Sequence, residues 1–179
     1  MRDRLKTFLL RLLFLYPLCL AGWWALAGIQ IEGIASLASG MLWIFLTDVQ
    51  VTLQTQWETI TLAMRDGLGQ PSIVIDPLVL TRGLPIYWAL MLAAPRFRET
   101  WRGFLLGVLA IFVTAALGFS GEAATRMAET VSSHVQSPWV PAAFIQIIAK
   151  SVATRVLPVG LWLWQQWSFL KSAISGMDR

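Results

Sequence analysis

The sequence contains a stretch of seventeen residues without a single charged side chain, Gly103 to Phe119. As an α-helix this stretch would be about 26 Å long, close to the hydrocarbon thickness of a bilayer, which is about 30 Å. A second long apolar run, Phe8 to Ala27, holds one charge, Arg11. Only 13% of the 179 residues are charged and 56% are hydrophobic, whereas about 25% charged is usual for soluble domains. The chain is therefore predicted to be an integral membrane protein.

The other apolar runs complete the predicted topology. Run 83–94 is long enough to span only when residues 77–81 are included. The last apolar region, 139–170, would be about 48 Å long as one helix, so we divide it into two parts. We expect an all-α polytopic membrane protein in a single membrane domain, residues 1–179. Its predicted parts are spans at about 8–28, 78–95, 103–120 and 153–170, a non-spanning re-entrant or interfacial helix at 33–47, and an amphipathic helix at 139–152.

The positions of Lys and Arg predict the orientation. They gather at the amino end, in the loop after run 83–94 and at the carboxyl end. Cytoplasmic loops carry an excess of these residues, and all three clusters are cytoplasmic if the chain crosses once before residue 82. This predicts four membrane crossings with both termini cytoplasmic. The same placement explains the formal net charge of +4, so we expect the bilayer and other membrane subunits as partners, and no nucleic acid.

Residues 49–58 alternate between apolar and polar side chains, which is the pattern of a half-buried strand. The alternation changes parity at Ile60, which predicts a bulge or bend near residues 57–59. A turn signal at 65–69 precedes a second short strand at 72–76. The segment 49–76 is therefore predicted to be a small extracytoplasmic β-ribbon. Because two strands alone are marginally stable in water, it should pack on the helices or on a partner.

Asp76 and Arg82 form the first candidate polar site. Pro77, Gly83 and Pro85 surround them, which indicates a rigid start to the following span. One interpretation is a functional polar site beneath the ribbon, since irregular backbone at membrane depth must be covered by protein or line a cavity. The other is an ion pair that fixes the start of the helix.

Lys150 and Arg155 form the second candidate site, because ionisable residues within apolar segments often mark functional sites. They are five residues apart and would not share one face of an α-helix. They either form a cationic track near the outer leaflet, or Lys150 extends to the headgroups while Arg155 pairs with a carboxylate. The carboxylates expected at similar depth are Glu32, Asp48 and Asp76.

Other reactive residues are scarce. Cys19 and His134 are the single Cys and the single His, and a Cys–His nucleophile needs them within hydrogen-bond reach. Cys19 is predicted in the middle of the first span and His134 in an outer loop, so their depths differ. No catalytic group, metal site or cofactor is predicted. The tryptophans, Trp23 and Trp162 among them, are interpreted as anchors at the membrane interfaces.

Several segments resemble exosortase H-associated membrane proteins. Ile-Asp-Pro-Leu at 75–78 precedes an apolar run, 83–95, that opens with Gly-Leu-Pro and ends in Pro. The carboxyl segment 156–170, with Val-Leu-Pro-Val, and the basic amino end are also similar to that family. The family more often has Asn where this chain has Asp76. The resemblance implies a bacterial inner-membrane protein that accompanies a sorting transpeptidase acting on carboxyl-terminal membrane tails of exported proteins, and it supplies no catalytic residue.

Three functions remain as hypotheses. The first is a non-enzymatic accessory or structural subunit of an inner-membrane assembly linked to exosortase-type envelope protein sorting. The second is a peripheral subunit of a bioenergetic or photosynthetic membrane complex. The third is a small membrane enzyme that uses Asp76, Arg82, His134 or Arg155 at the outer leaflet.

Overall fold

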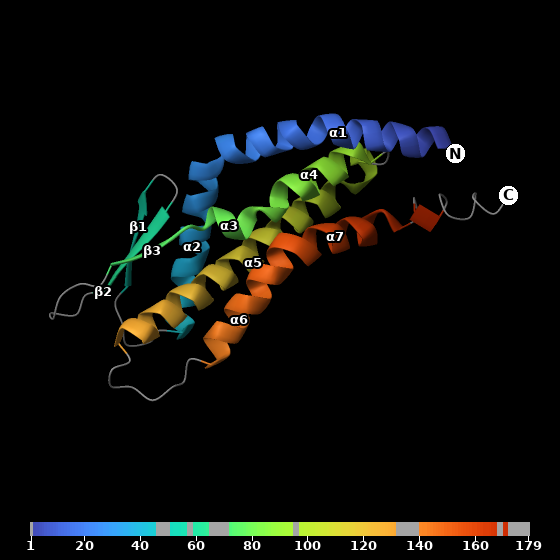
Figure 1. The fold of residues 1–179 in the computed structure, drawn as a ribbon. Coiled ribbons are helices and arrows are strands. Elements are labelled where there is room, and N and C mark those ends of the chain that lie inside the picture. The colour runs from blue at the N-terminus through green and yellow to red at the C-terminus, as the bar shows by residue number, and fades with distance from the viewer. Residues whose placement is uncertain are drawn as a thin grey trace.

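The computed structural model describes residues 2–45, 51–56, 59–64, 72–94, 97–131, 140–167 and 170–171. Its helices are α1 (Arg2–Ala25), α2 (Ala27–Phe45), α3 (Leu78–Thr81), α4 (Gly83–Ala93), α5 (Phe97–Val131), α6 (Val140–Ser151), the π-helix η1 (Val152–Val156) and α7 (Leu157–Gln165). The strands are β1 (Val51–Gln56), β2 (Thr59–Met64) and β3 (Ser72–Ile75). The fold is thus mainly helical, with one small sheet beside the helices (Figure 1).

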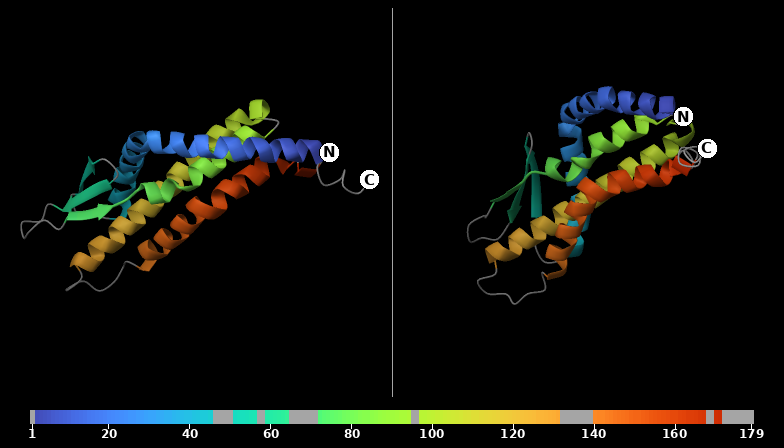
Figure 2. Two further views of the ribbon diagram at one scale, coloured as in Figure 1. Left: turned by 45° about the horizontal axis from the view of Figure 1, so that its top comes forward. Right: turned by 45° about the vertical axis from the view of Figure 1, so that its right-hand side comes forward.

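Helices α1, α4 and α5 and the stretch from α6 to α7 run side by side, and the sheet lies at one end of them (Figures 1 and 2). Helix α2 turns away from the end of α1 and runs across this bundle. The start of α1, the end of α4 and the end of α7 lie at the opposite end. Within the described residues, three helices are long and apolar enough to cross a membrane: Leu5–Ala25, Thr100–Arg126 and Phe144–Gln165. The apolar helix Leu78–Ala93 is shorter. The chain is a helical membrane protein.

The last apolar region differs from the prediction. The boundary predicted between an amphipathic helix at 139–152 and a span at 153–170 lies within one continuous helical stretch, which runs from α6 through η1 into α7. Pro158 has no N–H, and its ring would collide with a carbonyl of the preceding α-helical turn. The wider π turn, in which the Leu157 N–H bonds to the Val152 carbonyl, accommodates the proline. The candidate span therefore begins at Phe144.

Two further boundaries differ from those predicted. The helix α5 continues to Val131, eleven residues beyond the predicted end of its span at 120. The helix α2 begins at Ala27 rather than at 33, because the turn at Leu26 only bends the chain. Helical backbone hydrogen bonds continue from α1 into α2 through that turn: the N–H of Leu26 donates to the carbonyl of Gly22 at 3.0 Å, and the N–H of Gln30 donates to the carbonyl of Leu26 at 3.1 Å.

The sheet has three antiparallel strands in the order β1-β2-β3, where a two-stranded ribbon was predicted. The expected bulge at 57–59 is a reversal of the chain, since Gln56 lies opposite Thr59. A two-residue connection between strands is typical of a hairpin, and it also changes the parity of the apolar positions. Leu53 therefore lies opposite Leu62. Ile60 lies opposite Ile75, and both side chains are buried.

The core lies between the helices, with α5 at its centre. Its largest fully buried side chains include Tyr87, Phe119, Ile34 and Leu84. Where α5 meets α6, a Cβ atom added at Gly118 would lie 3.2 Å from the Cβ of Ala149, so small residues let these two helices approach closely.

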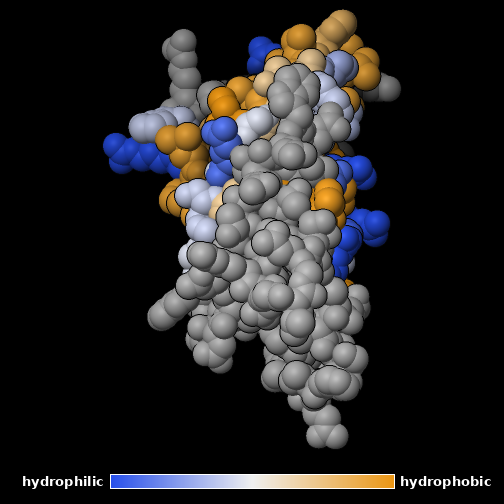
Figure 3. Space-filling model, turned by 90° about the vertical axis from the view of Figure 1, so that its left-hand side faces the viewer, coloured by the Kyte–Doolittle hydropathy of each residue, from blue (hydrophilic) through white to orange (hydrophobic). Residues whose placement is uncertain are grey.

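The outer surface of the helices is apolar. Phe14 on α1, Leu106 on α5 and Trp164 on α7 are among its most exposed side chains. The space-filling view from the sheet's side shows hydrophobic residues at the top of the picture, where α1 lies in Figure 1 (Figure 3). A surface of this kind suits contact with lipid tails or with other membrane helices.

Candidate functional site

Asp76 and Arg82 lie at the two ends of the short helix α3, and both side chains are exposed. The Oδ1 atom of Asp76 accepts a hydrogen bond from the backbone N–H of Leu78 at 2.9 Å. This contact is a local turn of the kind that Asp forms with the backbone two residues on. Among the described residues neither side chain takes part in an ion pair. The carboxylate of Asp76 thus shapes the chain before α3, and the expected ion pair with Arg82 does not form.

Lys150 and Arg155 also lie on the surface. Lys150 is in the last turn of α6 and Arg155 is in η1, and both side chains are exposed. In the part of the chain that the structure describes, neither forms an ion pair with Glu32, with Asp76 or with any other carboxylate. Asp48, the third expected partner, lies outside the described residues. Among the described residues no ion pair therefore links the four candidate residues to one another.

The segment η1 changes how Lys150 and Arg155 face. Within this segment the Oγ1 hydroxyl of Thr154 donates a hydrogen bond to the carbonyl of Lys150 at 2.7 Å. In an α-helix, side chains five residues apart point in different directions. Hydrogen bonds from residue i to i+5 give a wider turn, so the two cations diverge less than α-helical spacing implies. Single π turns inside α-helices are frequent at functional sites.

The most extensive interhelical polar cluster in the described residues surrounds Tyr87. Its hydroxyl oxygen lies 3.1 Å from Oε1 of Gln165, 3.2 Å from the carbonyl of Gly103 and 3.4 Å from that of Phe104. Gln165 donates from Nε2 to the same Gly103 carbonyl at 2.8 Å. The cluster joins α4, α5 and α7, and the ring of Tyr87 stacks on Phe104 with centroids 5.7 Å apart.

One sequence signal could have located this cluster. Gly103 and Gly107 have the four-residue spacing that allows close helix contact. A Cβ added at Gly107 would lie 2.9 Å from Cε1 of Tyr87 and closer still to its hydroxyl. A Cβ added at Gly103 would lie 3.1 Å from Cδ of Gln165. The spacing indicates that something packs there, but it does not identify Tyr87 or Gln165 as the residue that does.

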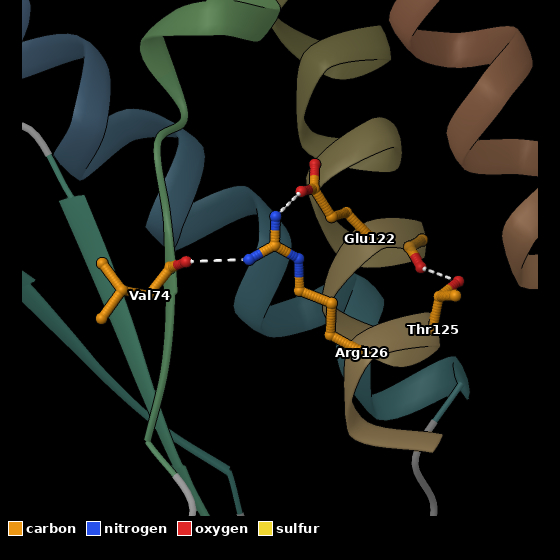
Figure 4. A network of polar contacts seen from close by, with 5 residues as sticks. Val74, Glu122, Thr125 and Arg126 are labelled. Carbon is orange, nitrogen blue, oxygen red and sulfur yellow. Dashed lines mark hydrogen bonds and ion pairs between the residues drawn. The ribbon is translucent and has the colours of Figure 1, made fainter. Parts of the chain in front are cut away.

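A second polar contact joins α5 to the sheet (Figure 4). Arg126 donates from Nη2 to Oε1 of Glu122 at 2.6 Å and from Nη1 to the carbonyl of Val74 at 3.1 Å. The carboxylate belongs to a residue that is 7% exposed. Both residues lie beyond 120, where the sequence predicts that the span ends. Their spacing of four residues is typical of a helical ion pair, and it was the available signal.

A third contact joins α1 to α3. The indole Nε1 of Trp23 donates to Oγ1 of Thr81 at 3.2 Å, and Gln30 Nε2 donates to the carbonyl of Trp23 at 2.7 Å. Trp23 is buried, so it packs between helices and is not an exposed anchor. Trp162 is buried as well, and its ring stacks on Phe8 with centroids 5.7 Å apart.

Cys19 is a free, buried thiol on α1. His134 lies outside the described residues. The described residues contain no group of three or more His, Cys, Asp or Glu side chains that could hold a metal ion.

Apolar helices of spanning length and an apolar outer surface together define a small polytopic helical membrane protein. The chain belongs to the exosortase H-associated membrane protein family, whose model matches residues 2–169. This confirms the resemblance seen in the sequence. The match includes every helix and strand of the fold. No curated protein and no solved structure matches the chain significantly.

Proposed function

We propose that this chain is a non-enzymatic accessory subunit of an inner-membrane assembly for exosortase-type envelope protein sorting. The observation that carries the proposal is the family match over residues 2–169, since the family is described by its association with exosortase H. Exosortase H is accordingly the first partner to test. The chain would act by holding this partner, or the partner's substrate, against its apolar helices.

The uses of the polar side chains support an accessory role over an enzymatic one. Tyr87 and Gln165 are engaged with the backbone and with each other between helices. Asp76 and Arg82 are exposed and form no ion pair in the described part of the chain. A catalytic site brings nucleophile, base and orienting group within hydrogen-bond reach. The contacts of Tyr87 and Gln165 favour a role in holding helices together, and Asp76 and Arg82 lack the partners that catalysis would require among the described residues.

We infer an orientation with both termini in the cytoplasm and four crossings. The basis is the excess of Lys and Arg in three clusters, which marks cytoplasmic segments. The start of α1, the end of α4 and the end of α7 lie at one end of the bundle, away from the sheet (Figure 1). One side of the membrane can therefore hold all three clusters, and the sheet would then be extracytoplasmic.

Cysteine labelling tests this orientation. In a Cys19→Ser background, Asp66→Cys should react with a membrane-impermeant maleimide added from outside to cells with a permeabilised outer membrane. Lys171→Cys should react only after the inner membrane is opened. Labelling of position 66 only from the cytoplasm would refute the orientation.

Co-purification tests the accessory role. The chain carries one affinity tag and exosortase H a second, and both are expressed in cells that make exosortase and then extracted in a mild detergent. We expect exosortase H to elute with the tagged chain and not with an unrelated polytopic protein carrying the same tag. A chain that purifies alone as a monomer would contradict the proposal.

A deletion strain separates the accessory role from the enzymatic alternative. Loss of the chain should reduce processing of exported proteins that carry carboxyl-terminal membrane tails, and the wild-type chain should restore it. A triple variant, Asp76→Ala with Arg82→Ala and His134→Ala, should restore processing equally well. Failure of that variant, when its membrane level is normal, would point to chemistry at these residues.

A further inference from the structure

Arg155 is an exposed cation near the middle of a candidate membrane span. The span runs from Phe144 to Gln165, and Arg155 lies ten residues before its end. At 1.5 Å per residue this is about 15 Å from that end, which is half of a hydrocarbon core about 30 Å thick. Lys150 lies five residues nearer the other end of the span. Arg155 is therefore the cation set deepest between the two ends of this span.

Arg155 has no ion-pair partner among the described residues. Arginine inside a span is rare and usually faces the interior of the bundle, a water-filled cavity or a partner charge. Here the side chain is exposed, so it faces away from the interior. A long side chain can extend toward the headgroups from a position near the end of a helix, and Lys150 is placed to do so. From the depth of Arg155 the headgroups are farther than an arginine side chain reaches.

The surface around Arg155 is suited to another helix. Val156 is 63% exposed and Val159 is 42% exposed. Ser151 is also exposed, and a Cβ added at the exposed Gly160 would meet nothing within 4 Å. Small residues on a membrane helix let a second helix approach closely. The face thus combines one unpaired cation with apolar and small neighbours.

We propose that Arg155 is the docking point for a partner's transmembrane segment that carries an Asp or Glu within its apolar stretch. The carboxylate would pair with the guanidinium at mid-depth, and the flanking apolar side chains would pack around the pair. Arginine is suited to this role because its planar fork binds a carboxylate with two parallel hydrogen bonds. The identity of the natural partner rests on the proposed function, but the chemistry of the contact does not.

A model helix tests the contact without any natural partner. The probe is a leucine-rich transmembrane peptide of about 21 residues with a central Asp, compared with the same peptide carrying a central Leu or Lys. The full-length chain is placed in phosphatidylcholine vesicles, and association is measured by energy transfer from its tryptophans to a label on the peptide. We expect the Asp peptide to bind about tenfold more tightly than the Leu peptide, as for a desolvated ion pair. We expect the Lys peptide to bind no better than the Leu peptide.

Variants of the chain assign this preference to Arg155. Arg155→Leu should abolish it, and Arg155→Lys should retain part of it. The matched control is Arg102→Leu, which removes an exposed cation that lies over Trp101 near the start of α5. Arg155→Leu removes a charge from an exposed position within the span, so it should remain folded, and its thermal unfolding is checked by tryptophan fluorescence.

Three results would overturn the proposal. One is equal binding of the Asp and Leu peptides to the wild-type chain. Another is a preference that survives Arg155→Leu. The third is that Arg155→Leu weakens binding of phosphatidylglycerol without changing peptide binding, which would show that Arg155 binds lipid. Failure of the proposed function would instead appear as absence of exosortase H from the wild-type eluate, whatever the peptide assay shows.

Discussion

Replacing Gly107 with alanine tests the closest contact between helices α4 and α5. Gly107 is buried, and a Cβ atom there would lie 2.9 Å from Cε1 of Tyr87 and nearer still to its Cζ and hydroxyl. Tyr87 is fully buried and stacks on Phe104, so its ring has no free direction in which to move. The substitution therefore forces either α4 or the tyrosine ring out of place.

The expected loss of stability can be worked out from three contributions. Overpacking a close-fitting core costs about 1–3 kcal/mol. Loss of the hydrogen bond made by the displaced hydroxyl adds about 1 kcal/mol. Alanine is favoured over glycine within a helix by about 1 kcal/mol, which offsets part of that cost. The net free energy of unfolding should fall by about 1–3 kcal/mol.

The assay is unfolding in mixed micelles, followed by tryptophan fluorescence. The matched control is Gly40→Ala on α2, where an added Cβ meets nothing within 4 Å; this variant should be as stable as the wild type or more stable by up to about 1 kcal/mol. In a Tyr87→Leu background, Gly107→Ala should cost clearly less, because the clashing ring is gone. Equal stability of the Gly107 and Gly40 variants would refute the reasoning.

Two further predictions concern the other contacts between elements. Arg126→Ala removes the hydrogen bond to the Val74 carbonyl and leaves the buried Glu122 without this cation. We therefore expect the free energy of unfolding to fall by about 1–3 kcal/mol, and amide hydrogen exchange to accelerate relative to the wild type more in β3 than in α4. Unchanged exchange in β3 would contradict this. Trp23→Phe keeps most of the buried ring but removes the hydrogen bond to Thr81, and unfolding measurements should show a loss of about 0.5–1.5 kcal/mol. Thr81→Val in the Trp23→Phe background should then cost less than it does alone, and full additivity would show that the bond contributes nothing.

Local signals located much of the fold. The uncharged run Gly103–Phe119 lies wholly within α5, and the segment 72–76 contains β3. Composition and hydropathy depend on single residues and their near neighbours, so they identify the class of protein and most of its elements. They give element boundaries less well, because helix ends depend on caps and packing.

The structure differs from the prediction in two places where one sequence pattern permits two structures. A change of parity in an alternating segment fits a bulge, and it fits a two-residue hairpin equally well. The register of Gln56 opposite Thr59 shows that here it was a hairpin. Similarly, the length of region 139–170 and the proline within it, Pro158, fit two helices, and they fit one helix with a π turn equally well. Proline is compatible with a continuous helix when a π turn precedes it, and no local rule specifies which of these occurs.

The polar cluster at Tyr87 could not have been derived from the sequence. Its members are separated by up to 78 residues, from Tyr87 to Gln165, and only the packing of α4, α5 and α7 brings them together. The spacing of Gly103 and Gly107 marks a close approach, but that pattern is common in membrane helices. Likewise, Arg155 lies within η1, so the direction in which its side chain faces depends on a π turn that the sequence does not predict.

Polar contacts at both ends of the bundle can fix the register of its helices. In a bilayer, apolar side chains pack about as well against lipid as against another helix, so apolar surface alone specifies relative position weakly. The cluster at Tyr87 joins α4, α5 and α7, while Arg126 joins α5 to β3 near the sheet. Because α5 takes part in both contacts, it cannot slide past its neighbours without breaking at least one of them. The scaffold is thus fixed by bonds within the chain, and Arg155, which has no ion pair in the part of the chain that the structure describes, is available to a partner.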